Sequence, residues 1–337
     1  MFDWFHSGKN VSGGQTLLVH AGPEGIPEPL RAMLEARLGP IHLLPGKLEA
    51  VTARGQIRKL QPKCIVVIGD PGLSADFWRE VGRPLYWINA PGSVAESALR
   101  CCVRSSLAAA ALPGSLLTGD PLLDLEPDIE AGFDPEFCER FQEVRDRQRW
   151  ILYFPQSIDP EEDLAYQTFL RLSRRGVGLL VLAPADPARY ETVYRDAMRF
   201  HLLTNRHGRL MTSYVPHKTR VYYIENPIAL RNMYACADVV VAGGSFGAAS
   251  GYAPQLVVPL ALGRPVVVGP RGDSALKRAA IADGAVLAVG SDGDLENSLA
   301  RLLQDAPARA LLGGFGRDWL QQQRGALARV LATVSQW

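Results

Sequence analysis

Short apolar runs alternate with longer amphipathic stretches along the whole chain. Runs such as CIVVIGD (residues 64–70) and DVVVAGG (238–244) are rich in β-branched residues and end near glycine, which predicts buried strands. The stretches between them place apolar residues at helical spacing and predict helices. Strands that alternate with helices form parallel sheets, because each helix carries the chain back to the start of the next strand. The pattern therefore predicts an α/β protein.

The predicted strands fall into two groups. The first group lies at residues 15–22, 41–46, 64–70 and 85–89, and the second at 150–155, 176–184, 219–226, 238–244, 265–270 and 284–290. Between them, residues 119–130 are polar, acidic and rich in proline, as in a linker. We predict an N-terminal domain over 1–125, a linker and helix over 126–149, and a C-terminal domain over 150–337. The end of the chain, 294–334, is predicted to be helical with one glycine-rich break.

Composition narrows the class of protein and of partner. A chain of 337 residues, 47% of them hydrophobic, suits two globular domains with ordinary cores. Lys and Arg (36) nearly balance Asp and Glu (35), so nucleic acid is not expected as a partner. No segment approaches the roughly 18 apolar residues of a membrane span. The aromatic residues of the start, MFDWFHSGKN, leave peripheral contact with a membrane as an alternative for a protein that we expect to be cytoplasmic.

The five cysteines are Cys64, Cys101, Cys102, Cys138 and Cys236. They form no C-x-x-C pair and have no neighbouring histidine at ligand spacing, so no metal site is expected. We interpret them as reduced, mostly buried thiols, as is usual in the cytoplasm.

A turn of small residues follows the predicted strand at 238–244. Gly243 and Gly244 let the backbone pass close to a ligand or to another segment, and Ser245 and Phe246 come next. If a helix begins at or after Ser245, its free N–H groups would favour a phosphate or a carboxylate. The alternative is a glycine turn that serves packing alone. Two doubly wound domains in series would place this turn in a cleft, at the carboxyl ends of the strands.

From residue 153 to residue 334, the order of segments resembles the bacterial Kdo transferases. The segments YACADVVVAGGSF (234–246), PLALGRPVVVGP (259–270), SIDPEEDLA (157–165) and VLAPADPARY (181–190) carry the resemblance. Upstream, LLVHAGPEG, YWINAPGS and LTGDPLLD are similar to further segments of that family. Such enzymes are GT-B glycosyltransferases, in which two Rossmann-like domains with parallel sheets face each other across a cleft.

The resemblance implies a function and a set of ligands. It implies an inverting transferase that takes a sugar from a nucleotide donor, CMP-Kdo, and adds it to a lipid A or envelope-type acceptor, with no metal and no other cofactor. The family's N-terminal membrane anchor is expected to be missing, with peripheral contact at the inner face of the plasma membrane as the remaining link to the envelope.

The resemblance also implies site residues. Glu24 is the candidate general base, although it stands one residue earlier than the family pattern has it, and capping of the following helix is the alternative. The candidates for nucleotide-sugar binding are Ser157, Gly243, Gly244, Ser245, Phe246, Gly269, Pro270 and Arg271, and those for the acceptor side are His20, Asp70 and Asn89. Three of these have a structural alternative, which is a hydrogen bond for His20, a turn cap for Asp70 and a helix N-cap for Ser157.

The donor side departs from the family pattern. Ala185 and Asp186 replace an Arg-His pair, Leu122 replaces a lysine, and SGYAPQLVV carries no carboxylate for a ribose. Arg271, Lys277 and Arg189 are the nearest cations and the candidates to replace the lost charges. The loss keeps a second interpretation open, a catalytically silent GT-B paralogue that binds a partner protein as an accessory subunit. A dinucleotide oxidoreductase is not favoured, because no G-x-G-x-x-G follows an early strand.

Overall fold

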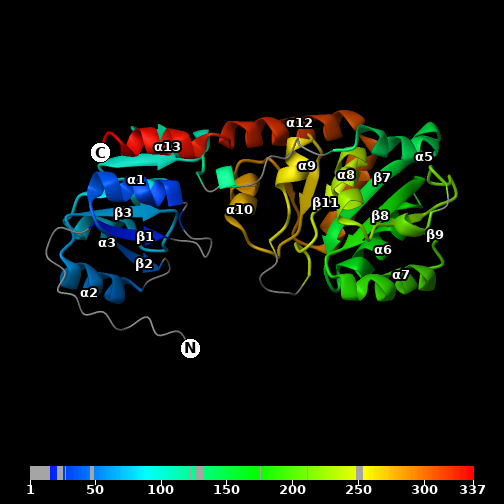
Figure 1. Ribbon diagram of the computed structural model, residues 1–337, viewed down its shortest axis with the longest axis horizontal. Helices are drawn as coiled ribbons and strands as arrows, with labels where there is room; N and C mark the ends of the chain where they lie inside the picture. The colour runs from blue at the N-terminus through cyan, green and yellow to red at the C-terminus, as the bar shows by residue number, and fades with distance from the viewer. Residues whose placement is uncertain are drawn as a thin grey trace. The chain divides into compact units, whose positions relative to one another are not determined.

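The chain folds into two compact units, residues 1–127 together with 322–337, and residues 128–321 (Figure 1). The computed structural model describes residues 16–20, 26, 28–45, 49–121, 123–125, 133–174, 176–210, 212–247 and 253–337. Among the described helices, none has the length and apolar character needed to cross a membrane.

The first unit is built on a six-stranded parallel sheet with the order β2-β1-β3-β4-β5-β6. Its strands are β1 (Thr16–His20), β2 (Ile41–Pro45), β3 (Cys64–Ile68), β4 (Leu85–Ile88), β5 (Arg100–Val103) and β6 (Leu116–Leu117). Its helices are α1 (Glu28–Leu38), α2 (Ala50–Leu60), α3 (Ala75–Glu80), α4 (Ser106–Ala111) and α13 (Ala326–Val334), with the 3-10 helices η1 (Ser93–Ala95) and η2 (Leu123–Leu125). Thr16 lies opposite both Ile41 and Cys64, which sets the parallel register around β1.

The second unit is built on a seven-stranded parallel sheet with the order β13-β12-β11-β7-β8-β10-β9. Its strands are β7 (Trp150–Ser157), β8 (Gly178–Pro184), β9 (Thr204–Arg206), β10 (Val221–Tyr223), β11 (Val239–Val241), β12 (Val266–Val268) and β13 (Leu287–Ala288). The helices are α5 (Gln142–Asp146), α6 (Glu161–Leu172), α7 (Tyr190–Arg199), α8 (Pro227–Cys236), α9 (Val257–Ala261), α10 (Ala275–Ala282), α11 (Asp292–Gln304) and α12 (Ala306–Gln323), with η3 (Pro135–Phe141), η4 (Pro187–Arg189) and η5 (His207–Arg209).

Each face of the second sheet is covered by helices, as the period-two pattern of its strands requires. Leu152 of β7 packs in one core cluster with Phe169 of α6, whereas its neighbour Tyr153 packs in the opposite cluster with Met233 of α8. Figure 1 shows α6 and α7 on one side of β7 and β8, with α8 on the other. The predicted fold class, two doubly wound Rossmann-like domains with parallel sheets, is confirmed. The predicted cleft between them stays a prediction.

The strands β5, β6 and β9 were missed by the sequence analysis. They contain four, two and three residues, and β9 (TNR) carries no apolar run, so the pattern offered too little signal.

Helix α13 belongs to the first unit, which differs from the predicted division that placed 150–337 in one domain. Its buried residues Ala326, Val330 and Val334 repeat every four residues. Val330 and Val334 share a core cluster with Leu30 and Leu34 of α1. The sequence shows that α13 has an apolar face. It does not show which surface this face packs against, because an apolar face can pack on any apolar surface.

The glycine-rich break predicted in the last helical stretch is wrong. Helix α12 runs through Gly313 and Gly316 without interruption. A Cβ at Gly313 would lie 2.0 Å from the carbonyl oxygen of Gly263, and one at Gly316 would lie 2.7 Å from Leu260. These glycines allow close packing of the helix rather than ending it.

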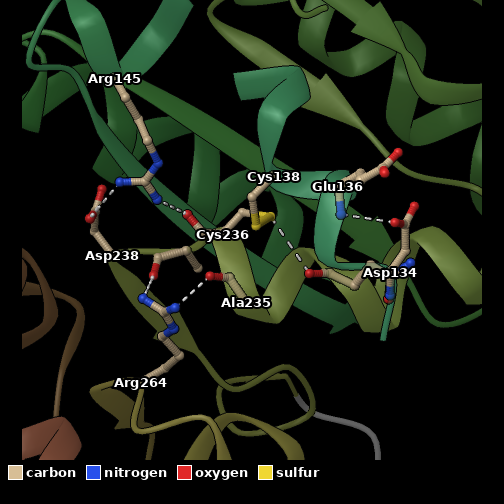
Figure 2. The surroundings of a disulfide bond; sticks show 10 residues. Asp134, Glu136, Cys138, Arg145, Ala235, Cys236, Asp238 and Arg264 are labelled. Carbon is tan, nitrogen blue, oxygen red and sulfur yellow. Dashed lines mark hydrogen bonds and ion pairs between the residues drawn. A yellow bond between two sulfur atoms is a disulfide. The ribbon is translucent and has the colours of Figure 1, made fainter. Parts of the chain in front are cut away.

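A disulfide joins Cys138 and Cys236, which corrects the expectation that all the cysteines are reduced (Figure 2). Their Cα atoms are 5.3 Å apart, although 98 positions separate them in the sequence. Arg145 donates to the carbonyl oxygen of Cys236 (2.6 Å), next to the bond. The pairing comes from the packing of η3 on α8, which spacing along the chain did not reveal.

We expect reduction of this disulfide to lower the free energy of unfolding by about 2–4 kcal/mol, because it closes a long loop of the unfolded chain. Thermal unfolding with and without a phosphine reductant measures the effect. The double variant Cys138→Ser with Cys236→Ser is the control, whose melting temperature should not respond to the reductant. Alkylation of Cys138 in protein denatured without reductant would contradict the bond.

Candidate functional site

The loops that follow β7, β8, β11 and β12 lie at one edge of the second sheet, because all its strands are parallel. The strand order reverses between β7 and β11, since the chain adds β8 on one side of β7 and β11 on the other. Open parallel sheets bind ligands outside the carboxyl ends of the strands at such a switch point. Ser157 ends β7, and the other candidate nucleotide-sugar residues lie in the loops after β11 and β12.

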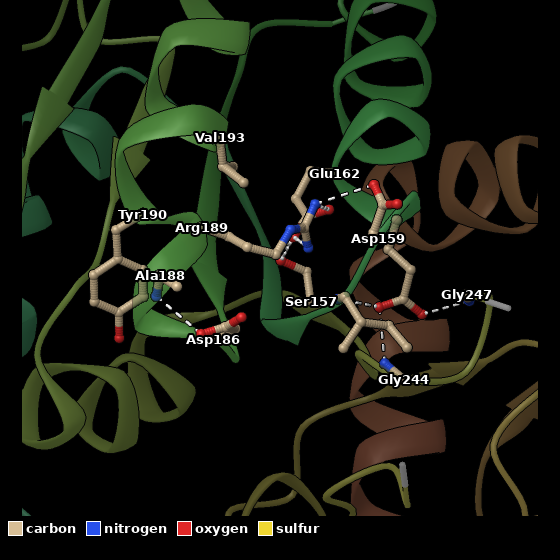
Figure 3. A network of polar contacts seen from close by, with 12 residues as sticks. Ser157, Asp159, Glu162, Asp186, Ala188, Arg189, Tyr190, Val193, Gly244 and Gly247 are labelled. Carbon is tan, nitrogen blue, oxygen red and sulfur yellow. Dashed lines mark hydrogen bonds and ion pairs between the residues drawn. The ribbon is translucent and has the colours of Figure 1, made fainter. Parts of the chain in front are cut away.

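The turn after β11 is occupied by a carboxylate of the chain itself. The side chain of Glu161, the first residue of α6, accepts hydrogen bonds from the backbone N–H groups of Gly244 (2.8 Å), Phe246 (2.7 Å) and Gly247 (3.1 Å). It also accepts one from the N–H of Ile158 (2.9 Å). Figure 3 shows the bonds at Gly244 and Gly247. These donors would suit an anion, and Glu161 supplies it from within the chain.

The glycines of this turn have identifiable structural reasons. A Cβ at Gly243 would lie 2.1 Å from the carbonyl oxygen of Pro155, and Gly244 has a φ of +75°. No helix begins between Ser245 and Gly247, and residues 248–252 lie outside the described part of the chain. The packing alternative therefore accounts for Gly243, while a ligand role for the turn stays a prediction.

Ser245 connects the turn to the loop after β12. Its hydroxyl donates to the carbonyl oxygen of Ala242 and accepts from the N–H of Gly269 (2.9 Å). Its carbonyl oxygen accepts from the N–H of Arg271 (2.7 Å). A Cβ at Gly269 would lie 2.3 Å from that same oxygen. The turn and the loop thus form one hydrogen-bonded unit, with Pro270 exposed between its contacts.

A second carboxylate of α6 holds the loops after β7 and β8. Glu162 is buried and accepts from the two terminal guanidinium nitrogens of Arg189 (2.8 and 3.0 Å) and from the Ser157 hydroxyl (3.0 Å). Asp159 also contacts Arg189 (3.2 Å), as Figure 3 shows. Burial opposes the charge of Arg189, but Glu162 outweighs it and the pKa of Arg189 is raised. The N-cap alternative for Ser157 is wrong, because α6 begins only after Pro160.

The three candidate cations, Arg189, Lys277 and Arg271, differ in whether their side chains already have partners within the chain. Arg189 is paired with carboxylates. The ammonium of Lys277 is buried and donates to the carbonyl oxygens of Gly269 (2.6 Å), Gly272 (3.0 Å) and Arg271. Burial lowers the pKa of Lys277, and Asp273 opposes that shift. Within the described ranges, the exposed side chain of Arg271 has no hydrogen bond or ion pair, so it is the cation available to an anionic ligand.

The acceptor-side candidates lie at the carboxyl edge of the first sheet. His20 ends β1 and Asn89 follows β4. Asp70 is exposed, and its carboxylate accepts from the N–H of Gly72 (2.8 Å), as the turn-capping alternative requires. The amide nitrogen of Asn89 donates to the carboxylate of Asp120 (2.7 Å), and its buried Oδ1 has no partner among the described residues. Glu24, the candidate base, lies outside the described residues.

Sequence reasoning missed the roles of Glu161 and Glu162. The signal that could have revealed them is the acidic pair that opens α6, since carboxylates at a helix start bind N–H groups. No group of three or more His, Cys, Asp or Glu among the described residues could hold a metal ion.

The fold and the site together define an α/β protein with two Rossmann-like domains, the second of which carries polar side chains and glycine turns at the carboxyl edge of its sheet. Comparison with known proteins finds sequence similarity to two enzymes of the same name. The chain is 31% identical over 160 residues to the 3-deoxy-D-manno-octulosonic acid transferase of Haemophilus influenzae, a match over 45% of this chain and 36% of that enzyme. It is 34% identical over 108 residues to the transferase of the same name from Bordetella pertussis, over 31% of this chain and 24% of that enzyme. The matches confirm the resemblance. They cover about a third of the first relative's length and about a quarter of the second's.

Solved structures give similar folds at lower identity. The C-terminal CMP-Kdo binding domain of WaaA from Acinetobacter baumannii matches with a TM-score of 0.49 and 21% identity, over 55% of this chain and 96% of that one. MurG of the same organism matches with a TM-score of 0.49 and 11% identity, over 96% and 99% of the two chains. No protein-family model matches the chain.

We expect Gly243→Ala to lower the free energy of unfolding by about 1–3 kcal/mol, because a methyl group at this position meets backbone that cannot move aside. Urea denaturation measures the change. Gly314→Ala is the control, since a Cβ there meets nothing within 4 Å and alanine favours the helix α12. Equal stability of Gly243→Ala and the wild type would contradict the close approach of the turn to β7.

Proposed function

We propose that the protein is a glycosyltransferase of the Kdo transferase type. In this proposal it transfers a sugar from a nucleotide donor, CMP-Kdo, to an acceptor of the lipid A or envelope class. The sequence matches to two enzymes of that name support it, and so does the series of two Rossmann-like domains. We also propose peripheral contact with the inner face of the plasma membrane, where such acceptors are found.

The observation that carries the proposal is the edge of the second sheet at its switch point. There Ser245 binds the loop that carries Arg271, and the Arg271 side chain is exposed and uncommitted within the described ranges. A phosphate needs charge-assisted donors, and a guanidinium provides them in a fixed planar fork. We propose that Arg271 contacts the phosphate of the donor, with Ser157, Phe246 and Pro270 near it.

The reaction then needs a base on the acceptor side. We propose that the Glu24 carboxylate takes the proton of the acceptor hydroxyl, whose oxygen attacks the anomeric carbon of the donor sugar. A carbon–oxygen bond forms to the acceptor, the bond to the phosphate oxygen breaks, and CMP leaves with the electron pair. Inversion at the anomeric carbon follows from this single displacement. His20, Asp70 and Asn89 are proposed to line the acceptor side.

We expect the purified protein to bind CMP with saturation, and Arg271→Ala to weaken that binding about 10- to 100-fold, since a charge-assisted contact to phosphate is lost. Calorimetric titration at fixed salt measures both, with UDP and GDP as competing nucleotides. Arg301→Ala, which removes an exposed cation from the far end of α11, is the control for net charge and should bind like the wild type.

Two results would count against the proposal. Absence of binding to any of the three nucleotides at millimolar concentration would favour the silent partner-binding paralogue instead. Equal loss of affinity in Arg271→Ala and Arg301→Ala would show that overall charge, rather than the loop after β12, attracts the nucleotide.

A further inference from the structure

The turn between Gly244 and Gly247 is shaped by a carboxylate that has no cationic partner. Glu161 is 2% exposed, and none of the ion pairs between described residues includes it. A buried charge without a counter-ion is costly unless hydrogen bonds satisfy it. The four N–H donors of Ile158, Gly244, Phe246 and Gly247 meet that need. The turn is therefore held in one conformation by the charge that it solvates.

The contacts continue from the turn to the candidate phosphate contact. Ser245 is completely buried. It lies between Gly244 and Phe246, whose N–H groups both donate to the carboxylate of Glu161. From that position it accepts from the N–H groups of Gly269 and Arg271, which fixes the start of the loop after β12. The ammonium of Lys277 donates to three carbonyl oxygens of the same loop. A change at Glu161 would thus reach Arg271 through Ser245.

The filled turn also limits where a ligand anion can bind. Its N–H groups already face the Glu161 carboxylate, and a second anion there would meet like charge at short range. A phosphate at this edge must therefore use donors outside the turn. This argument separates the glycine turn, which binds an internal carboxylate, from the loop after β12, which presents Arg271.

We propose that Glu161 is a positioning residue for nucleotide-sugar binding, which holds the turn 244–247 and through it the loop of Arg271, and that the ligand phosphate does not enter the turn. The proposal rests on the proposed function. It assigns Glu161 no contact with the ligand.

The test compares Glu161→Gln with Asp163→Asn, a matched change of an exposed carboxylate in the same turn of α6. The glutamine keeps one acceptor oxygen and turns an NH₂ group toward backbone donors, which breaks half of the contact. We expect amide exchange at residues 244–247 to accelerate about tenfold or more and CMP affinity to fall about tenfold, with no change in Asp163→Asn. Hydrogen–deuterium exchange and calorimetry measure the two effects, and Glu161→Asp, which keeps the carboxylate, should recover part of both.

The outcomes separate this proposal from the function on which it rests. If wild type binds CMP and Glu161→Gln binds it equally well, whatever its melting temperature, the positioning role is wrong. If Glu161→Gln does not fold, the same comparison is made with Glu161→Asp, for which faster amide exchange at 244–247 together with unchanged CMP affinity overturns the role. If the wild type binds no nucleotide, the proposed function has failed, and the positioning role fails with it. Protected amides at 244–247 would then still show that Glu161 holds the turn.

Discussion

The burial of one carboxylate, that of Glu161, is the constraint on which the carboxyl edge of the second sheet depends. A charge that is almost inaccessible to water needs donors in fixed positions, and the backbone of the neighbouring turn provides them. The turn can provide them because Gly243 allows it to lie against the end of β7 and Gly244 takes a positive φ. The glycines and the carboxylate are therefore parts of one feature, which joins α6 to the switch point of the sheet.

Other charged and polar groups at this edge are also satisfied by hydrogen bonds and ion pairs within the chain. Glu162 holds Arg189, and carbonyl oxygens surround the ammonium of Lys277. Asn226 accepts from the first N–H groups of α8, so that helix start is also satisfied by its own chain. Polar groups that look available to a ligand in the sequence are thus used internally in the fold. Of Arg189, Lys277 and Arg271, only the side chain of Arg271 has no hydrogen bond or ion pair within the described ranges.

Long-range contacts define the limits of what local pattern could predict. The alternation of apolar and polar residues was sufficient for the parallel sheets, because a strand such as 64–68 is buried on both faces whatever its neighbours are. It was insufficient for α13, whose apolar stripe fits either domain, and for Cys138 and Cys236, which meet only when η3 packs on α8. The glycines of α12 resembled a helix break because their packing partners, Gly263 for Gly313 and Leu260 for Gly316, lie far away in the sequence.

The sequence by itself determined the fold class, the order of strands and loops along the chain, and the resemblance to Kdo transferases. Each of these depends only on local periodicity or on the order of motifs. Only the tertiary structure decided which charged groups are already neutralised. Glu161 and Arg271 both belong to motifs that the sequence makes visible. The carboxylate of Glu161 is buried among N–H groups, whereas the side chain of Arg271 has no hydrogen bond or ion pair among the described residues. The difference arises because desolvation and hydrogen bonding depend on neighbours in space, and those neighbours come from strands and helices far apart in the chain.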